Sequence, residues 1–183
     1  KVGEPVSITV KDNGKGMTAE EIQNKFLVIG RNRRSEEGDV PSVKYGRRPT
    51  GKKGLGKLAL FGLAKEITLK TVQNGLLNKF SLDWDDLIAS DSVYKPKSDV
   101  ENADTQQENG TAITLKDLKR KSGFNLESTA DSLSKIFIVD ETFEIILEKT
   151  DGEQVEVTNE RRYDQIEQEF FWDKNSLELD DYE

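Results

Sequence analysis

The chain has 183 residues, of which 34% are apolar, and it carries a net charge of −8 with no cysteine and no histidine. This length suits one ordinary domain with a hydrophobic core. The missing thiols exclude disulfides and cysteine-ligated metal sites, and the missing imidazoles exclude histidine-based triads and a phosphohistidine acceptor. The acidic balance argues against a protein that coats nucleic acid over its whole surface.

The hydropathy pattern indicates neither a membrane span nor a secretory leader. A transmembrane helix needs about eighteen or more consecutive apolar residues, and the sequence contains no such run. The chain does not open on a charged stretch followed by an apolar one, which a signal peptide requires. We therefore expect a cytoplasmic protein. Because Lys1 directly precedes a predicted strand, we also expect that the natural protein extends further at the front.

The first predicted elements are a strand, a glycine-rich turn and a helix. Apolar and polar residues alternate over residues 5–11, which is typical of a half-buried strand. The stretch DNGKGM at 12–17 follows as a tight turn. Thr18 and Glu21 have the spacing of a capping box, with Met17 and Ile22 at the hydrophobic staple positions. A helix over about 19–27 is predicted.

The middle of the chain alternates polar segments with compact elements. Residues 31–50 are rich in Gly, Pro, Ser and Arg, which predicts a long loop of the kind that forms lids. The apolar run KLALFGLAK after Gly56 favours a short buried helix. Strands are predicted at 66–72 and 76–82, joined by an Asn-Gly turn. We interpret the polar residues 89–110 as another loop.

The remaining sequence predicts a strand, a helix, a hairpin and a final helix. GTAITLKDL reads as the strand, LESTADSLSKIF as the helix, and FEIILEKTDGEQVEVT as a hairpin that turns at Asp151-Gly152. In RRYDQIEQEFFWD the aromatic and aliphatic residues recur at helical spacing. These elements either complete the domain or begin a coupling region.

Two interpretations of the glycine cluster GKKGLGK at 51–57 as a phosphate-binding loop fail. It matches the Walker A pattern except at Leu58, where a hydroxyl would ligate magnesium, and the preceding residues are basic rather than a buried strand. A Rossmann fingerprint fails because no G-x-G-x-x-G follows a buried strand and opens a long helix.

A third reading takes both glycine clusters together. Three motifs occur in order: D-x-G-x-G-M at 12–17, G-x-x-G-x-G at 51–56, and Asn-Gly-Thr at 109–111. Over roughly residues 5–118 the chain resembles the Bergerat-fold ATP-binding domain of the GHKL superfamily, which contains gyrase B, heat-shock chaperones, sensor histidine kinases and MutL. The basic 29–60 segment is most similar to bacterial members, and Microrchidia-type ATPases are also similar.

The resemblance implies an α+β fold, namely a two-layer sandwich of a mixed, mostly antiparallel sheet with helices on one face. It implies a core over 1–118 with a lid at about 29–56, followed by a C-terminal part over 119–183. It further implies that ATP is the cofactor, with Mg²⁺ in the intact protein. Asp12 would then accept the adenine amino proton, and Thr111 would complete the polar network around Asp12 and a bound water.

The other implied contacts come from glycines, one methionine and the lid. Gly14 and Gly16 would let the backbone approach the base, and Met17 would lie against the adenine face. The lid would turn backbone amides toward the phosphates; its residues are Gly51, Lys52, Lys53, Gly54 and Gly56. Independently of the resemblance, residues 31–57 contain nine basic and three acidic residues, which makes a basic island in an acidic chain.

The sequence departs from the family pattern at the hydrolytic site. GHKL proteins carry, on a helix before the first motif, a glutamate that activates water and an asparagine that ligates magnesium. Glu4 lies at a strand edge without an asparagine at helical spacing. We assign no catalytic and no metal residue within residues 1–183, and we expect ATP hydrolysis from the intact protein rather than from this chain alone.

Several interpretations stay open at the level of sequence. The first is an ATP-driven conformational switch with a homodimer or protein partner. A sensor-type kinase is disfavoured by the lack of histidine. A scaffold with a degenerate pocket would need only an ordinary strand-to-helix turn at 12–16, and a nucleic-acid contact could use the basic lid.

Overall fold

The computed structural model describes residues 6–28, 38, 40–41, 46–47, 58–89 and 96–164. The chain divides into two compact units, residues 1–124 and 125–183. Among the described residues no helix is long and apolar enough to cross a membrane.

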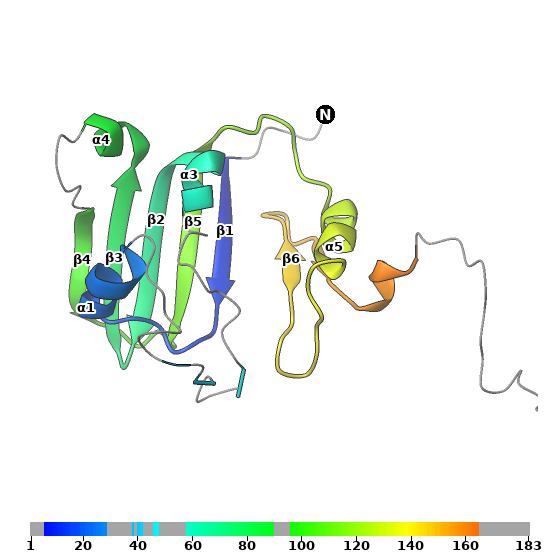
Figure 1. Cartoon of the computed structure of the whole chain (residues 1–183), viewed down its shortest axis with the longest axis horizontal. Helices are drawn as coiled ribbons and strands as arrows, with labels where there is room; N and C mark the ends of the chain where they lie inside the picture. Colours follow the sequence, from blue (N-terminus) through cyan, green and yellow to red (C-terminus); the bar gives the residue numbers. More distant parts are fainter. Residues whose placement is uncertain are drawn as a thin grey trace, which may run out of the picture. The chain divides into compact units, whose positions relative to one another are not determined.

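The first unit is built on a five-stranded sheet in the order β1-β5-β2-β3-β4 (Figure 1). The strands are β1 Ser7–Asp12, β2 Ala64–Gln73, β3 Leu76–Asp83, β4 Lys97–Asp104 and β5 Gly110–Leu118. Every neighbouring pair is antiparallel. Because β5 lies between β1 and β2, the end of β1 meets the start of a strand about 100 residues later in the chain.

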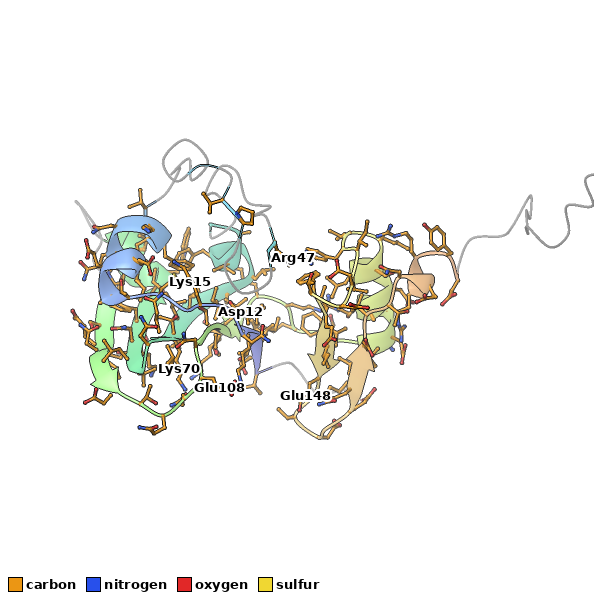
Figure 2. All side chains as sticks on the ribbon, turned by 90° about the horizontal axis from the view of Figure 1, so that it is seen from below. Asp12, Lys15, Arg47, Lys70, Glu108 and Glu148 are labelled. Carbon is orange, nitrogen blue, oxygen red and sulfur yellow. The ribbon has the colours of Figure 1, made fainter. Side chains whose placement is uncertain are left out.

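Among the described residues, four short helical segments accompany the sheet: α1 Ala19–Glu21, the π-helix η1 Ile22–Phe26, α3 Leu58–Leu63 and α4 Trp84–Ala89. Two buried clusters join them to one face of the sheet. Ile22 packs with Leu69 and Phe80, and Phe61 packs with Ile67 and Leu115. The other face is polar, and Figure 2 shows Lys70 on the side away from α1. The predicted α+β fold with helices on one face is confirmed.

The helix after β1 begins as its sequence predicts. The Thr18 hydroxyl accepts from the Glu21 N–H at 3.0 Å, and the Glu21 carboxylate accepts from the Thr18 N–H at 3.2 Å. Burial acts to raise the pKa of Glu21, but hydrogen bonds from Lys15, the Thr18 N–H and Lys25 outweigh it and lower that pKa. Beyond Glu21 the helix widens into the π-helix, which the sequence pattern did not reveal.

The hairpin of β2 and β3 confirms the Asn-Gly prediction. Asn74 and Gly75 have φ of 53° and 77°, both in the left-handed region that this two-residue turn requires. The prediction of a loop over 89–110 is wrong in part, because residues 97–104 form β4. This strand lies at the sheet edge and is exposed at most positions, so it shows no hydrophobic alternation that the sequence could reveal.

The short helix α3 follows the predicted position but is not buried on every side. Phe61 is 8% exposed and contacts the core, whereas Leu63 is 52% exposed. The helix α4 was not predicted. Its first turn is capped by Asp83, whose carboxylate accepts from the N–H groups of Asp85 and Asp86.

The second unit contains α5 Leu126–Ser134, the hairpin of β6 Ile146–Glu148 and β7 Gln154–Glu156, and the 3₁₀ turn η2 Glu160–Arg162. Its buried cluster joins Leu126 and Ala130 of α5 to Val155 and Val157. The predicted helix and hairpin are confirmed, although α5 ends three residues earlier than its pattern suggests. The predicted final helix lies mostly outside the described residues.

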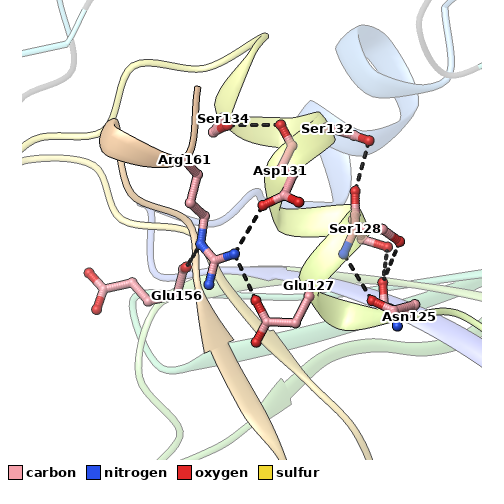
Figure 3. Close-up of polar contacts among 9 residues, drawn as sticks. Asn125, Glu127, Ser128, Asp131, Ser132, Ser134, Glu156 and Arg161 are labelled. Atoms are coloured by element: carbon pink, nitrogen blue, oxygen red, sulfur yellow. Dashed lines mark hydrogen bonds and ion pairs between the residues drawn. The ribbon is translucent and has the colours of Figure 1, made fainter. Parts of the chain in front are cut away.

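One arginine ties α5 to the end of the hairpin (Figure 3). The Arg161 guanidinium donates to Glu127 at 2.7 Å, to Asp131 at 3.0 Å and to the Glu156 carbonyl at 3.1 Å. These two carboxylates raise the pKa of Arg161, mainly through their hydrogen bonds. Glu127 and Asp131 lie one turn apart on α5, so the Arg161 guanidinium binds both, and Arg162 adds a second link through the Ser134 carbonyl.

We expect Thr18→Ala to lower the free energy of unfolding by about 1 kcal/mol, because the first helical turn loses one side of its capping box. Urea denaturation monitored by circular dichroism measures this change. Ser7→Ala, at an exposed position of β1, is the control. A loss no larger than that of the control would contradict a stabilising cap.

We expect Arg161→Ala to destabilise the second unit by about 1 to 3 kcal/mol, because two carboxylates and one carbonyl lose their shared donor. Hydrogen exchange of α5 amides reports the local loss. Lys135→Ala removes a cation from an exposed site just after α5 and is the matched control. Equal exchange rates in both variants would show that Arg161 is not the link.

Candidate functional site

A row of polar residues crosses the helix-bearing face of the sheet at one end of its strands. The strand register pairs Asp12 with Thr111, Thr111 with Thr71, and Thr71 with Asn78. These four residues therefore occupy adjacent positions on β1, β5, β2 and β3. Side chains directly opposite each other on antiparallel strands have Cβ atoms about 5 Å apart, so each residue of this row lies beside the next.

The rows behind this polar row are apolar. Two residues away from the polar row on each strand, the register aligns four apolar residues: Val10, Ile113, Leu69 and Phe80. Leu69 and Phe80 are buried under η1 with Ile22. Over two residues along each strand, the sheet face thus changes from hydrophobic core to hydrogen-bonding groups. This change occurs where the loop of residues 13–18 passes over the strands.

The Thr71 hydroxyl is the centre of the polar row. Its Oγ1 accepts from the Met17 N–H at 2.9 Å, donates to the Gly110 carbonyl at 3.1 Å, and lies 3.2 Å from the Thr111 Oγ1. Thr71 is 1% exposed. Sequence reasoning missed this residue. The available signal was its place in ITLKTV, where a polar residue takes the position that alternation assigns to the buried face.

Asp12 ends β1 beside Thr111 (Figure 2). Its Oδ1 accepts from the Gly14 N–H at 2.9 Å, an Asx turn that starts the loop. The Asp12 side chain is exposed, whereas the resemblance implied a carboxylate buried against a purine. Its position next to the Gly110-Thr111 corner is the one that the ordered motifs predicted.

Close backbone packing requires glycine at Gly16, one of the predicted site residues, and at Gly110, for which the sequence predicted no such role. Gly16 has a φ of 74°, and a Cβ there would lie 1.8 Å from the Val72 carbonyl oxygen. A Cβ on Gly110 would lie 2.3 Å from the Asp12 carbonyl oxygen. Gly14 is tight against its own turn, since a Cβ there would lie 2.8 Å from the Asp12 Oδ1. A larger residue at Gly16 would push the loop away from β2, and one at Gly110 would push β5 away from the end of β1.

Met17 is half-buried and packs against the cluster of Ile22, Leu69 and Phe80. Its N–H is the donor to Thr71, so the backbone at Met17 is fixed by the polar row while its side chain joins the core. Lys15, two residues earlier, is directed to Glu21 at 3.0 Å. The predicted staple and the predicted site contact therefore fall on the same residue.

The lid part of the prediction is not described by the structure. Gly51, Lys52, Lys53, Gly54 and Gly56 all lie outside the described residues, and α3 begins at Leu58. Within the described ranges there is also no group of three or more acidic, histidine or cysteine side chains that could hold a metal ion.

The site offers a carboxylate, a hydroxyl and an apolar side chain, and no metal-binding group is found among the described residues. Asp12 provides a carboxylate at the strand end and Thr111 a hydroxyl, while Met17 brings its N–H to the polar row and its soft apolar side chain to the adjoining core. These features fit the base of a nucleotide. Mg²⁺ finds no comparable cluster of oxygen ligands among the described side chains.

Comparison with known proteins identifies the same region. Residues 1–114 match the family model described as "Histidine kinase-, DNA gyrase B-, and HSP90-like ATPase". The chain is also similar to "Putative type II restriction enzyme HgiDII" of Herpetosiphon aurantiacus, with 36% identity over 126 residues. That alignment covers 67% of this chain and 20% of the relative, so the chain spans about one fifth of the relative's length. The chain belongs to the histidine kinase-, DNA gyrase B- and HSP90-like ATPase family.

Proposed function

We propose that this chain binds ATP and acts as the nucleotide-binding part of an ATP-driven conformational switch. The observation that carries the proposal is the polar row that brings Asp12, Thr111 and Thr71 together beneath the glycine-rich loop. Family membership supports the nucleotide. The switch part of the proposal rests on the long basic segment between α1 and α3 in the sequence. A bound triphosphate would attract this segment and change its position.

In this proposal the base is recognised at the end of β1. The Asp12 carboxylate accepts a proton from the exocyclic amino group, and Thr111 supplies a hydroxyl next to it. Met17 covers one face of the ring. A guanine would present a carbonyl oxygen to Asp12 in place of the amino group, so the carboxylate selects adenine over guanine by repulsion as well as by attraction.

The phosphates would be bound by the basic segment. Residues 31–57 have a threefold excess of basic over acidic residues, and the glycines at 51, 54 and 56 allow backbone amides to face an anion. When bound, Mg²⁺ neutralises charge on the triphosphate. We assign its ligand, and the glutamate that would activate water, to residues outside 1–183.

The edge of the sheet is consistent with an additional element in the intact protein. Val6 and Val10 lie on the helix-bearing side of β1 and are 85% and 64% exposed. Among the described residues nothing covers these two side chains, although the face beside them is core. We propose that a further segment packs here and supplies the hydrolytic residues, so that the chain alone binds nucleotide weakly.

A second candidate function is contact with DNA by the whole protein. One observation favours it, namely that the relative of which this chain covers a fifth is named as a type II restriction enzyme. In that case ATP binding here would control an activity located elsewhere in the longer protein. A direct DNA contact by the basic segment would instead give an affinity that falls steeply with salt.

We expect Asp12→Asn to weaken ATP binding at least about tenfold, because a charged acceptor of an amino proton is replaced by a group that presents a donor. Calorimetric titration with ATP, with and without Mg²⁺, measures the change on the 183-residue chain and on a form extended at its N-terminus. Asp104→Asn is the matched control, since Asp104 ends β4 at the same end of the sheet.

The same titrations separate the alternatives. ATP affinity that is equal in Asp12→Asn and Asp104→Asn would contradict base recognition at β1. If neither form of the wild-type chain binds ATP, the degenerate-scaffold interpretation replaces the switch. DNA affinity that ATP does not reduce, and that Asp12→Asn leaves unchanged, would favour the nucleic-acid contact.

We expect Thr71→Val to lower the free energy of unfolding by about 1 to 3 kcal/mol, because the buried Met17 N–H loses its acceptor at nearly unchanged volume. ATP affinity should fall as well, since the loop of residues 13–18 is no longer held to β2. Thr68→Val, on the polar face of β2, is the control. Wild-type stability in Thr71→Val would show that this hydroxyl is not the centre of the site.

A further inference from the structure

The polar row ends at a buried amide with one unsatisfied group. Asn78 is 1% exposed and lies directly opposite Thr71 on β3. Its Oδ1 accepts from the Asn102 N–H at 2.9 Å. Its Nδ2 is the one buried side-chain nitrogen or oxygen that lacks a hydrogen-bond partner in the described part of the chain.

The orientation of this amide is fixed by the contact with β4. Asn102 has a φ of 50° and lies where the register between β3 and β4 shifts, so its N–H is available to a side chain. Because Oδ1 is turned to β4, Nδ2, which lies at the other edge of the planar amide, is turned away from β4. The Nδ2 hydrogens therefore extend the polar row rather than leave it.

A buried donor without an acceptor costs roughly 1 to 3 kcal/mol, and folded proteins commonly avoid that cost by enclosing an ordered water. Asn78 and Thr71 are direct cross-strand neighbours, so a single water held between their side chains would reach both. It would accept from Asn78 Nδ2 and donate to the Thr71 Oγ1, whose hydroxyl has two lone pairs.

We infer that Asn78 is a positioning residue of the nucleotide site, acting through one buried water held between Asn78 and Thr71. This inference rests on the proposed function and adds a residue to it. The Met17 N–H occupies one lone pair of the Thr71 Oγ1, and the water occupies the other. The Thr71 proton is then directed to the Gly110 carbonyl or to Thr111.

The consequence concerns the hydroxyl of Thr111. The Met17 N–H and the water then occupy both lone pairs of the Thr71 Oγ1. The Thr111 hydroxyl therefore cannot donate to Thr71, and its proton is available to the ligand. Thr111 then presents a donor beside the Asp12 acceptor. Adenine has the matching pair, a ring nitrogen that accepts next to an amino group that donates. Asn78 thus sets the direction of hydrogen bonding at the base without contacting it.

The water is tested directly by NMR on the 183-residue chain, without nucleotide. We expect a cross-relaxation peak between the Asn78 side-chain amide and a long-lived water. The side-chain amide of Asn159, which donates to the Val139 carbonyl, serves as the internal control and should show none. Absence of the peak at Asn78 would overturn the inference, and no variant is needed to reach that result.

The coupling to the site is tested by ATP titration of a double-mutant cycle. We expect Asn78→Leu and Thr111→Val each to weaken ATP binding roughly 3- to 10-fold, and the double variant to be no weaker than the worse single variant. Asn102→Gly keeps the N–H and tolerates the positive φ, so it is the control and should bind ATP as the wild type does.

The outcomes distinguish the two proposals. Additive losses, or unchanged affinity in Asn78→Leu, would refute the role of Asn78 while leaving ATP binding intact. If the wild type binds no ATP in either form, the proposed function fails and with it the link from Asn78 to the base. The NMR peak would then still decide whether the buried water exists.

Discussion

The structure of the first unit depends on one buried hydroxyl, that of Thr71. Three segments far apart in the sequence meet at this group: the loop after β1 through Met17, the middle of the chain through Thr71 itself, and the start of β5 through Gly110 and Thr111. A hydrogen bond in such an enclosed place is strengthened by the low local dielectric, and an unpaired group there is costly. The loop of residues 13–18 therefore has one position on the sheet.

The position of the site follows from how the sheet face is divided. The apolar rows under η1 and α3 supply the hydrophobic stabilisation, and the polar row begins where the helices no longer cover the strands. Gly16 and Gly110 allow the backbone to close over this boundary, since a Cβ at either would collide with a carbonyl oxygen. The hydrophobic core and the proposed ligand site thus use the same strands at different positions along their length.

Charge is distributed unequally between the two units. Residues 1–124 contain 22 basic and 17 acidic residues, whereas residues 125–183 contain 5 basic and 18 acidic residues. A nucleotide carries several negative charges and is attracted to the first unit and repelled by the second. The described part of the second unit uses its few cations internally, as the contacts of Arg161 with Glu127 and Asp131 show. This unequal distribution agrees with a nucleotide site in the first unit.

The amino-acid sequence by itself determined the elements whose signals are local. The strand at β1, the Thr18 cap and the Asn-Gly turn depend on neighbours a few residues apart, and these predictions are confirmed, although β1 is exposed at most positions rather than half-buried. Only the tertiary structure decided which residues meet. Thr71 and Asn78 appear as ordinary strand residues until β5 is inserted between β1 and β2, and β4 carries no hydrophobic pattern because it is an exposed edge. The Asn-Gly turn sets the pairing of Thr71 with Asn78, but the pairing of β5 with β1 and β2 joins segments far apart in the chain, and no short stretch of sequence encodes that register.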